Sequence, residues 1–207
     1  MTLRIWGRIS SVNVQKVVWC ADEMGLEYER LDVGGSFGKT KTPEYLAMNP
    51  NSLVPVIDDD GFVLYESNAI VRYLAGRHSG GKLWPEDLRR RADVDRWMEW
   101  QSSSFTPAMR DAFWQLIRTP EPQRDGAAVE KSRAESERLA GILDAHLAKQ
   151  RYLTDNGFTI ADIVTGCAAH RWLSLPVQRE NRPNLQRWYD EIKSRPGARQ
   201  VTSLSLS

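Results

Sequence analysis

The residues of this chain best placed to do chemistry are Val54-Pro55 and Glu66-Ser67. Val54-Pro55 stands where a strand is expected to begin, and Glu66-Ser67 stands where the next helix is expected to begin. A rigid strand edge can pair with an extended peptide, and a carboxylate beside a helix N-terminus can receive both an ammonium and a carboxylate group. The two pairs together therefore predict a site for an extended peptide that carries both charges.

A second group of candidates lies in the segment before the first expected helix, which contains Ser10, Ser11 and Asn13. Short polar side chains commonly cap a helix N-terminus, and spacing alone favours that use here. The same side chains can also donate a hydrogen bond to an anion beside the positive end of the helix. Both interpretations stay open at the level of the residues.

The first 80 residues carry the periodicities of a small α/β domain. Residues 3–7 alternate in the manner of a strand, and residues 13–25 place apolar side chains on one helical face before Gly25. A strand, helix and strand in this order predict a parallel pair joined by a right-handed crossover. The sequence Asp58-Asp-Asp-Gly61 predicts a hairpin. The remaining expected elements are a strand at 28–33, a short helix at 43–48, hairpin strands at 54–57 and 62–65, and a helix at 67–78.

The strand signal almost disappears after Gly80-Gly81 and Pro85, which indicate a linker. We therefore predict two domains, residues 1–80 and residues 87–207, the second all-α. One long helix is expected over 87–118 with a kink at Pro107, which lacks a backbone donor. Further helices are expected over 127–149, from a capping box at Thr159 and Asp162, and over 184–193. Residues 202–207 are expected to fray.

Composition excludes several classes of function. The 207 residues have a net charge of +1, so no strong overall field attracts nucleic acid. No apolar run approaches the ~20 residues that cross a bilayer, which predicts no membrane partner. Cys20 and Cys167 form no CxxC pair, and the three histidines have no metal-ligand spacing, so no metal site is expected. The N-terminal residues enter a strand pattern directly, which favours the cytoplasm.

Taken in this order, these motifs resemble the cytosolic-type glutathione transferase family, and the bacterial members best. The resemblance covers nearly the whole chain. It rests on Val54-Pro55 before the third strand, the Glu66-Ser67 pair, the helical second domain and the capping box of Phe158–Asp162. It implies a thioredoxin-like N-terminal domain, an all-α C-terminal domain, glutathione as co-substrate, a homodimer and a role in detoxification.

The resemblance also implies roles for single residues. The loop Arg8–Asn13 contains no tyrosine and no cysteine, so this chain is similar to the serine-type, theta- or nu-like members. Ser11 falls on the catalytic serine, with Ser10 as its rival and Asn13 as a helper. Glutathione would pair with Val54 before a cis-Pro55, and its γ-glutamyl group would bind Glu66 and Ser67. Lys39, Thr40 or Lys41 would meet the glycyl carboxylate, while Leu53 departs from the lysine or glutamine usual in the family.

The second substrate is expected over the sulfur. The apolar candidates for its pocket are Ile9, Phe105, Met109 and Phe113, although aromatic residues at helical spacing are more often core. Arg8 and Arg110 are candidates to polarise an electrophile or to bind an acidic one. The expected function is attack of the glutathione thiolate on a small hydrophobic electrophile. The alternatives are glutathione-dependent reduction of disulfides or peroxides, for which Asn13 beside Ser11 is a hint, and a non-catalytic scaffold of the same fold.

Overall fold

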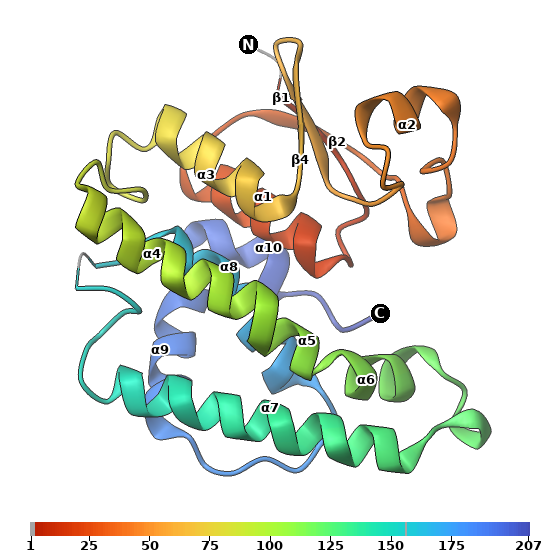
Figure 1. The fold of residues 1–207 in the computed structure, drawn as a ribbon, viewed down its shortest axis with the longest axis vertical. Coiled ribbons are helices and arrows are strands. Elements are labelled where there is room, and N and C mark those ends of the chain that lie inside the picture. The colour runs from red at the N-terminus through yellow and green to blue at the C-terminus, as the bar shows by residue number, and fades with distance from the viewer. Residues whose placement is uncertain (1–2, 156) are drawn as a thin grey trace. The chain divides into compact units, whose positions relative to one another are not determined.

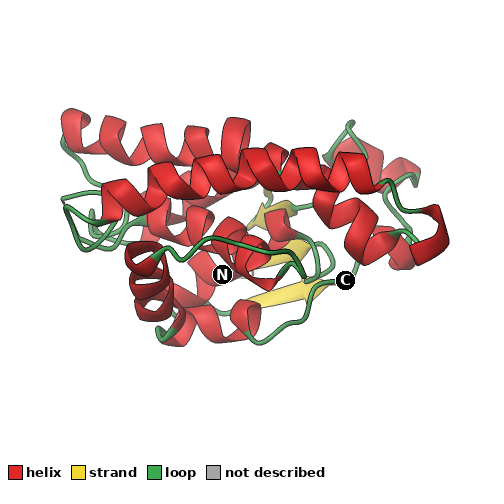
Figure 2. Cartoon of the chain, turned by 90° about the horizontal axis from the view of Figure 1, so that it is seen from below, coloured by secondary structure: helices red, strands yellow, loops and turns green. Residues whose placement is uncertain are grey.

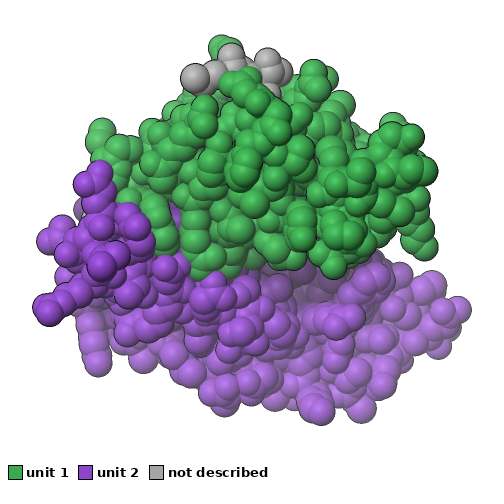
Figure 3. Space-filling view, turned by 45° about the horizontal axis from the view of Figure 1, so that its top comes forward, with its two compact units in different colours: residues 1–84, 195–203 green, residues 85–194, 204–207 purple. Residues whose placement is uncertain are grey.

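The computed structural model describes residues 3–155 and 157–207 of the chain. These residues form two compact units. Unit 1 runs to Trp84 and includes Arg195–Ser203, and unit 2 consists of Pro85–Ser194 and Leu204–Ser207 (Figure 3). The strands gather in one region of the chain, and helices make up most of the remainder (Figure 2).

Unit 1 is built on a four-stranded mixed sheet of order β2-β1-β3-β4. Its strands are β1 Leu3–Trp6, β2 Tyr28–Leu31, β3 Val56–Asp59 and β4 Phe62–Tyr65. β1 pairs with β2 in parallel and with β3 antiparallel, and β3 and β4 form the hairpin expected from the sequence. The register sets Ile5 opposite Ile57, and both side chains are fully buried. The predicted parallel pair and hairpin are therefore confirmed.

Three α-helices of unit 1 accompany this sheet, namely α1 Val12–Glu23, α2 Pro43–Met48 and α3 Ser67–His78. α1 and α3 lie side by side (Figure 1). α2 begins where the sequence predicts, because the Thr42 hydroxyl accepts the Tyr45 N–H at 3.3 Å and Pro43 occupies the first turn. Tyr45 is buried in a cluster with Val33 and Val56, which attaches α2 to the sheet.

Unit 2 is helical. Its α-helices are α4 Leu88–Trp100, α5 Thr106–Ala108, α6 Arg110–Phe113, α7 Gly126–Leu147, α8 Ile160–Ser174 and α9 Pro183–Lys193. All but three residues of α8 are buried, and a helix that is apolar on every side is typical of the centre of a domain. The predicted thioredoxin-like domain followed by a helical domain is thus the observed architecture.

The single helix predicted over 87–118 is wrong in detail. π-helical turns occupy Gln101–Phe105 and Trp114–Arg118, and Met109 leaves the helical region at φ −85° and ψ 0°. Pro107 has no N–H to donate to the preceding turn, and local π-helical turns change the hydrogen-bond register around it. The sequence predicted a kink, whereas the chain makes several short helical pieces.

The C-terminal segment also differs from the predicted domain boundary. Residues of Arg195–Ser203 form η5 Pro196–Ala198 and α10 Arg199–Thr202, and both pack against α1 within unit 1. The Arg195 Nε atom lies 2.9 Å from Glu23 Oε1, and Val201 is fully buried. An ion pair across 172 positions in the sequence leaves no local signal, so periodicity did not find it.

We expect Gly197→Ala to destabilise the protein. A Cβ atom at Gly197 would lie 2.7 Å from both the Cα and the backbone nitrogen of Glu23, and backbone of a helix cannot move aside cheaply. Overpacking of this kind costs about 1–3 kcal/mol. Urea unfolding followed by far-ultraviolet circular dichroism measures the loss.

Gly126→Ala is the matched control, because a Cβ atom there meets nothing within 4 Å. Its unfolding midpoint should stay unchanged or rise slightly, since alanine favours a helix. Equal midpoints for both variants would show that the contact between Gly197 and α1 is not tight in solution.

None of the helices formed by the described residues has both the length and the apolar character required to cross a bilayer.

Candidate functional site

A small cleft in unit 1 brings together several of the residues that the sequence singled out. Its volume is about 40 Å³, and its lining consists of Asn13, Asn49, Leu53, Val54, Pro55, Glu66 and Ser67. The start of α1, the turn before β3 and the start of α3 contribute these residues. A cleft of this size holds one end of a peptide, so a longer ligand must continue over the surface of the unit.

The turn at Val54-Pro55 presents an edge of backbone. The Val54–Pro55 peptide bond is cis, which confirms the expectation drawn from the resemblance. Neither the N–H nor the C=O of Val54 makes a hydrogen bond to another described residue. Groups of this kind need a partner, from water or from a ligand. The edge is therefore open to strand-like pairing with an extended peptide.

The same turn is held in place by two side chains. The Leu53 carbonyl accepts hydrogen bonds from the Tyr45 hydroxyl at 2.8 Å and from Asn49 Nδ2 at 2.9 Å. Asn49 is only 2% exposed, and its Oδ1 atom accepts the Asn51 N–H at 3.0 Å. Sequence reasoning did not include Asn49 in the site. The Asn49-Pro-Asn-Ser run ahead of Val54-Pro55 was the only signal that could have found it.

Glu66 and Ser67 form the second wall of the cleft. Glu66 precedes α3 with φ +73°, a left-handed conformation that is costly for a residue with a side chain. Ser67 is the first residue of α3 and is 7% exposed, while the Glu66 side chain is exposed. The Ser67 hydroxyl donates to Asn13 Oδ1 at 3.4 Å, which joins the starts of α3 and α1. The arrangement offers a carboxylate, a hydroxyl and helix N–H groups to one zwitterionic ligand end.

Ser11 precedes α1 as its N-cap residue, but its side chain makes no capping hydrogen bond. The hydrogen bonds of Ser11 come from its backbone. Its N–H donates to the Arg8 carbonyl at 3.1 Å, and its carbonyl accepts the Gln15 N–H at 2.9 Å. The half-buried hydroxyl therefore has no partner among the described residues. The same holds for the hydroxyl of Ser10, so the geometry keeps both serines as candidates.

Lys39 and Ile9 lie in unit 1 outside the lining of the cleft. Lys39 follows the turn η1 Gly35–Phe37, is exposed and has φ +66°. Ile9 is half-buried in the loop between β1 and α1. Both roles assigned to them from the sequence stay predictions.

Phe105, Met109 and Phe113 lie in unit 2 and are buried, with exposed fractions of 0%, 0% and 3%. The Phe105 ring stacks on Trp100 with centroids 5.3 Å apart. The guanidinium carbon of Arg171 lies 4.1 Å from the centroid of the Phe113 ring. These contacts are those of packed core residues, and the predicted contact with an electrophile stays a prediction.

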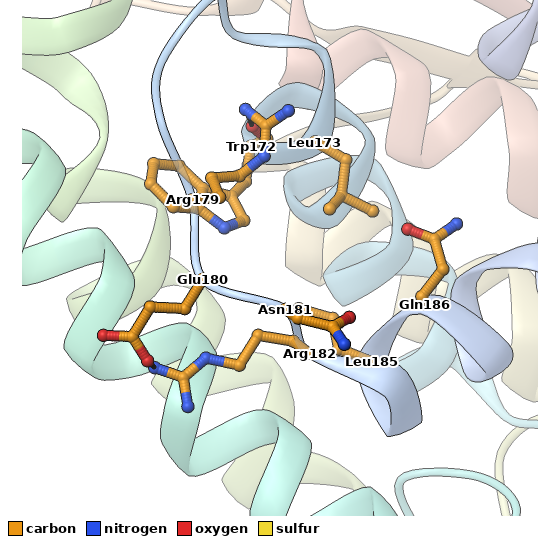
Figure 4. A pocket seen from close by; sticks show the side chains of 8 residues that line it. All are labelled: Trp172, Leu173, Arg179, Glu180, Asn181, Arg182, Leu185 and Gln186. Carbon is orange, nitrogen blue, oxygen red and sulfur yellow. Dashed lines mark hydrogen bonds and ion pairs between the residues drawn. The ribbon is translucent and has the colours of Figure 1, made fainter.

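A second hollow, of about 180 Å³, lies within unit 2 where α8 ends and α9 begins (Figure 4). Both arginines that line it already bind other groups of unit 2. Arg179 lies over the Trp172 ring and donates to the carbonyls of Trp172 and Leu175 at 3.2 and 2.6 Å, which satisfies the end of α8. Arg182 pairs with Glu137 at 3.0 Å and with Glu180 at 2.8 Å. The hollow is lined by groups with structural tasks, unlike the cleft at Val54.

Metal-ligating side chains do not converge in the described part of the chain: no three of its His, Cys, Asp and Glu residues could hold an ion together. The lining of the cleft itself presents hydroxyl, amide and carboxylate groups and backbone.

Comparison with known proteins shows the family of this chain. The family model described as "Glutathione S-transferase, N-terminal domain" matches residues 1–76, and the model of the C-terminal domain of that family matches residues 105–196. Glutathione S-transferase GstB of Escherichia coli is 39% identical over 99% of this chain and all of its own length. Glutathione S-transferase 3 of Zea mays is 31% identical over 94% of this chain and 90% of its own.

A solved structure shares the fold closely. It is the theta class glutathione S-transferase from Xanthomonas axonopodis pv. citri with glutathione bound, at a TM-score of 0.95. The two chains are 42% identical, and the match covers 99% of each.

Proposed function

Because this chain belongs to the glutathione S-transferase family, we propose that its cleft at Asn13, Val54 and Ser67 binds glutathione and that the bound thiolate attacks small hydrophobic electrophiles. The observation that carries the proposal is the unpaired backbone of Val54 beside the Glu66-Ser67 wall. A scaffold protein has no use for that combination.

The chemistry of the cleft supports glutathione as its ligand. The γ-glutamyl ammonium is placed on the Glu66 carboxylate, and the γ-glutamyl carboxylate on the hydroxyl and N–H of Ser67 at the start of α3. The cysteinyl unit pairs with the backbone of Val54 before cis-Pro55. The glycyl carboxylate extends beyond the cleft to Lys39.

Activation of the thiol is assigned to Ser11. Its hydroxyl is too weak a base to take the proton, but it can donate a hydrogen bond to the thiolate and so stabilise the charged form. The positive end of α1 acts in the same direction. A charge-assisted hydrogen bond is worth roughly 1.5–3 kcal/mol, and about 1.4 kcal/mol corresponds to one pKa unit. The thiol pKa then falls from about 8.5 to around 7.

Asn13 is assigned to the γ-glutamyl end as a supporting residue, because its side chain accepts a hydrogen bond from Ser67 and lines the cleft. Because Asn13 contacts Ser67, its position beside Ser11 is weaker support for the reductase alternative. The electrophile is proposed to bind beside Ile9, which is half-buried in the loop between β1 and α1.

Two further proposals concern the protein as a whole. A homodimer is supported by β4, an edge strand on which Phe62 and Val63 are 48% and 39% exposed. Analytical ultracentrifugation should give twice the chain mass, and a monomer would refute the dimer. The cytoplasm is the proposed location, and cell fractionation checks it.

The proposed binding site is tested with reduced glutathione and the variant Ser67→Ala. We expect the dissociation constant, measured by calorimetry, to rise about 10- to 100-fold, because a hydrogen bond to a charged group is worth roughly 1.5–3 kcal/mol. Conjugation to 1-chloro-2,4-dinitrobenzene, followed by absorbance of the thioether, should be catalysed by the wild type.

Ser102→Ala is the control, since Ser102 is exposed in unit 2 and donates only to the Glu99 carbonyl. It should bind glutathione as the wild type does. Reduction of hydroxyethyl disulfide without conjugation would favour the reductase. A wild type that binds no glutathione would leave the scaffold as the better description.

A further inference from the structure

Arg8 lies in the same loop as Ser11, and its guanidinium has no partner among the described residues. The residue is half-buried, and its side chain makes no ion pair or hydrogen bond with any described residue. Its backbone is fixed, because the Arg8 N–H donates to the Val33 carbonyl at 3.0 Å and its carbonyl accepts the Ser11 N–H at 3.1 Å. The position of Arg8 is thus coupled directly to that of Ser11.

The side chain of Arg8 lies across two glycines that leave room for it. A Cβ atom at Gly35 would lie 2.8 Å from Arg8 Nε and 3.0 Å from its Cδ. A Cβ atom at Gly34 would lie 3.5 Å from Arg8 Nη1 and 3.3 Å from Val54 Cγ1. The guanidinium and the side chain of Val54, the residue proposed to pair with the cysteinyl unit, therefore both lie against Gly34.

Arg8 forms no ion pair with any described acidic residue. Asp32 in the strand-to-loop segment pairs with Arg30, so its carboxylate is already engaged. A guanidinium carries five donors in a planar fork that matches a carboxylate. A partly desolvated guanidinium with unused donors is an anion-recognising group.

We propose that Arg8 binds a carboxylate on the electrophile, so that this enzyme prefers acidic acceptors over neutral acceptors of the same shape. The inference rests on the proposed function, which assigns the two carboxylates of glutathione to Ser67 and Lys39. The Arg8 guanidinium is then left for the second substrate. Arg8 acts as a specificity residue that orients the acceptor near the sulfur.

The reaction that tests this is aromatic substitution on 4-chloro-3-nitrobenzoate. The glutathione thiolate forms a C–S bond at the carbon that carries chlorine, the C–Cl bond breaks, and chloride leaves with the bonding electrons. The carboxylate takes no part in the bond changes. 4-Chloro-3-nitrobenzamide is the neutral acceptor with the same ring and leaving group, and each enzymatic rate is divided by its uncatalysed rate.

We expect wild-type kcat/KM, so corrected, to favour the benzoate, and Arg8→Gln to lower the benzoate-to-benzamide ratio at least tenfold. Arg8→Lys keeps the charge and should retain part of the preference for the benzoate. This variant tests the inference if Arg8→Gln folds poorly. Arg4→Gln is the matched control, because Arg4 is an exposed arginine of β1 that pairs with Glu29 at 3.2 Å. Its ratio should equal that of the wild type.

The outcomes separate this inference from the proposed function. If the wild type conjugates the benzamide and Arg8→Gln leaves the ratio unchanged, the inference is overturned and the proposed function stands. If Arg8→Gln raises KM for glutathione equally with both acceptors, the guanidinium binds the glycyl carboxylate instead, which also overturns it. If the wild type conjugates 1-chloro-2,4-dinitrobenzene but neither acceptor, the inference is overturned and the proposed function stands. If it conjugates none of the three compounds, both fail.

Discussion

Replacing Ser11 with alanine is expected to raise the thiol pKa of bound glutathione toward its free value of about 8.5. The variant loses the one hydroxyl proposed to donate to the thiolate, and a hydrogen bond to a charged group is worth roughly 1.5–3 kcal/mol. That corresponds to a rise of about one to two pKa units and to a loss of about 10- to 100-fold in kcat/KM at neutral pH. Stability should change little, because the Ser11 side chain makes no capping hydrogen bond.

The measurement is the ultraviolet absorbance of the bound thiolate, titrated against pH. Ser10→Ala is the matched control: it lies one residue away, is also half-buried, and should leave the thiol pKa near 7. A depressed pKa that survives in Ser11→Ala and is lost in Ser10→Ala would transfer the role to Ser10. A depressed pKa that survives in both variants would assign thiolate stabilisation to the N-terminus of α1 alone.

Replacing Asp162 with alanine is expected to lower the free energy of unfolding by about 3–5 kcal/mol at pH 5. The carboxylate is fully buried and accepts the N–H groups of Leu153 and Thr159 at 3.0 and 2.9 Å and the Trp188 indole N–H at 2.9 Å. The substitution leaves these buried donors without an acceptor, and each costs about 1–3 kcal/mol. Urea unfolding monitored by tryptophan fluorescence gives the loss.

The effect of this substitution should depend on pH. Burial raises the pKa of Asp162 from 3.8 to about 6, against the hydrogen bonds that lower it. Between these values the folded chain binds more protons than the unfolded chain, so the stability contributed by the protonated carboxyl is lost as pH rises through 6. A protonated Asp162 can donate to the Thr159 hydroxyl, 3.3 Å away, and still accept the three N–H groups. The deficit of the alanine variant should therefore be about 1 kcal/mol smaller at pH 7 than at pH 5.

Asp87→Ala is the control, because it removes an aspartate that caps a helix while exposed to solvent. Asp87 is exposed and accepts the N–H groups of Arg89 and Arg90 at the start of α4. Loss of an exposed cap costs about 1 kcal/mol. If Asp162→Ala costs no more than Asp87→Ala, or if its deficit grows with pH, burial of the carboxyl does not govern its contribution.

The sequence alone determined the elements whose signals are local. The helices Pro43–Met48 and Ser67–His78 begin and end where the residues predict, because a proline, a hydroxyl cap and an apolar stripe act within one or two turns. The strand–helix–strand unit and the hairpin follow from the same short-range patterns. The pairs Val54-Pro55 and Glu66-Ser67 were found in this way and lie in one cleft.

Tertiary structure alone decided where long-range partners meet. Residues 195–203 belong with unit 1 because Glu23 lies beside Arg195 and Gly197, far away in the sequence. Asn49 enters the site because it holds the Leu53 carbonyl. Whether a polar side chain caps its own helix, pairs with another residue or keeps its donors for a ligand depends on neighbours in space. The sequence therefore named Ser11 and Arg8 as candidates, and the fold alone left the Ser11 hydroxyl and the Arg8 guanidinium without partners among the described residues.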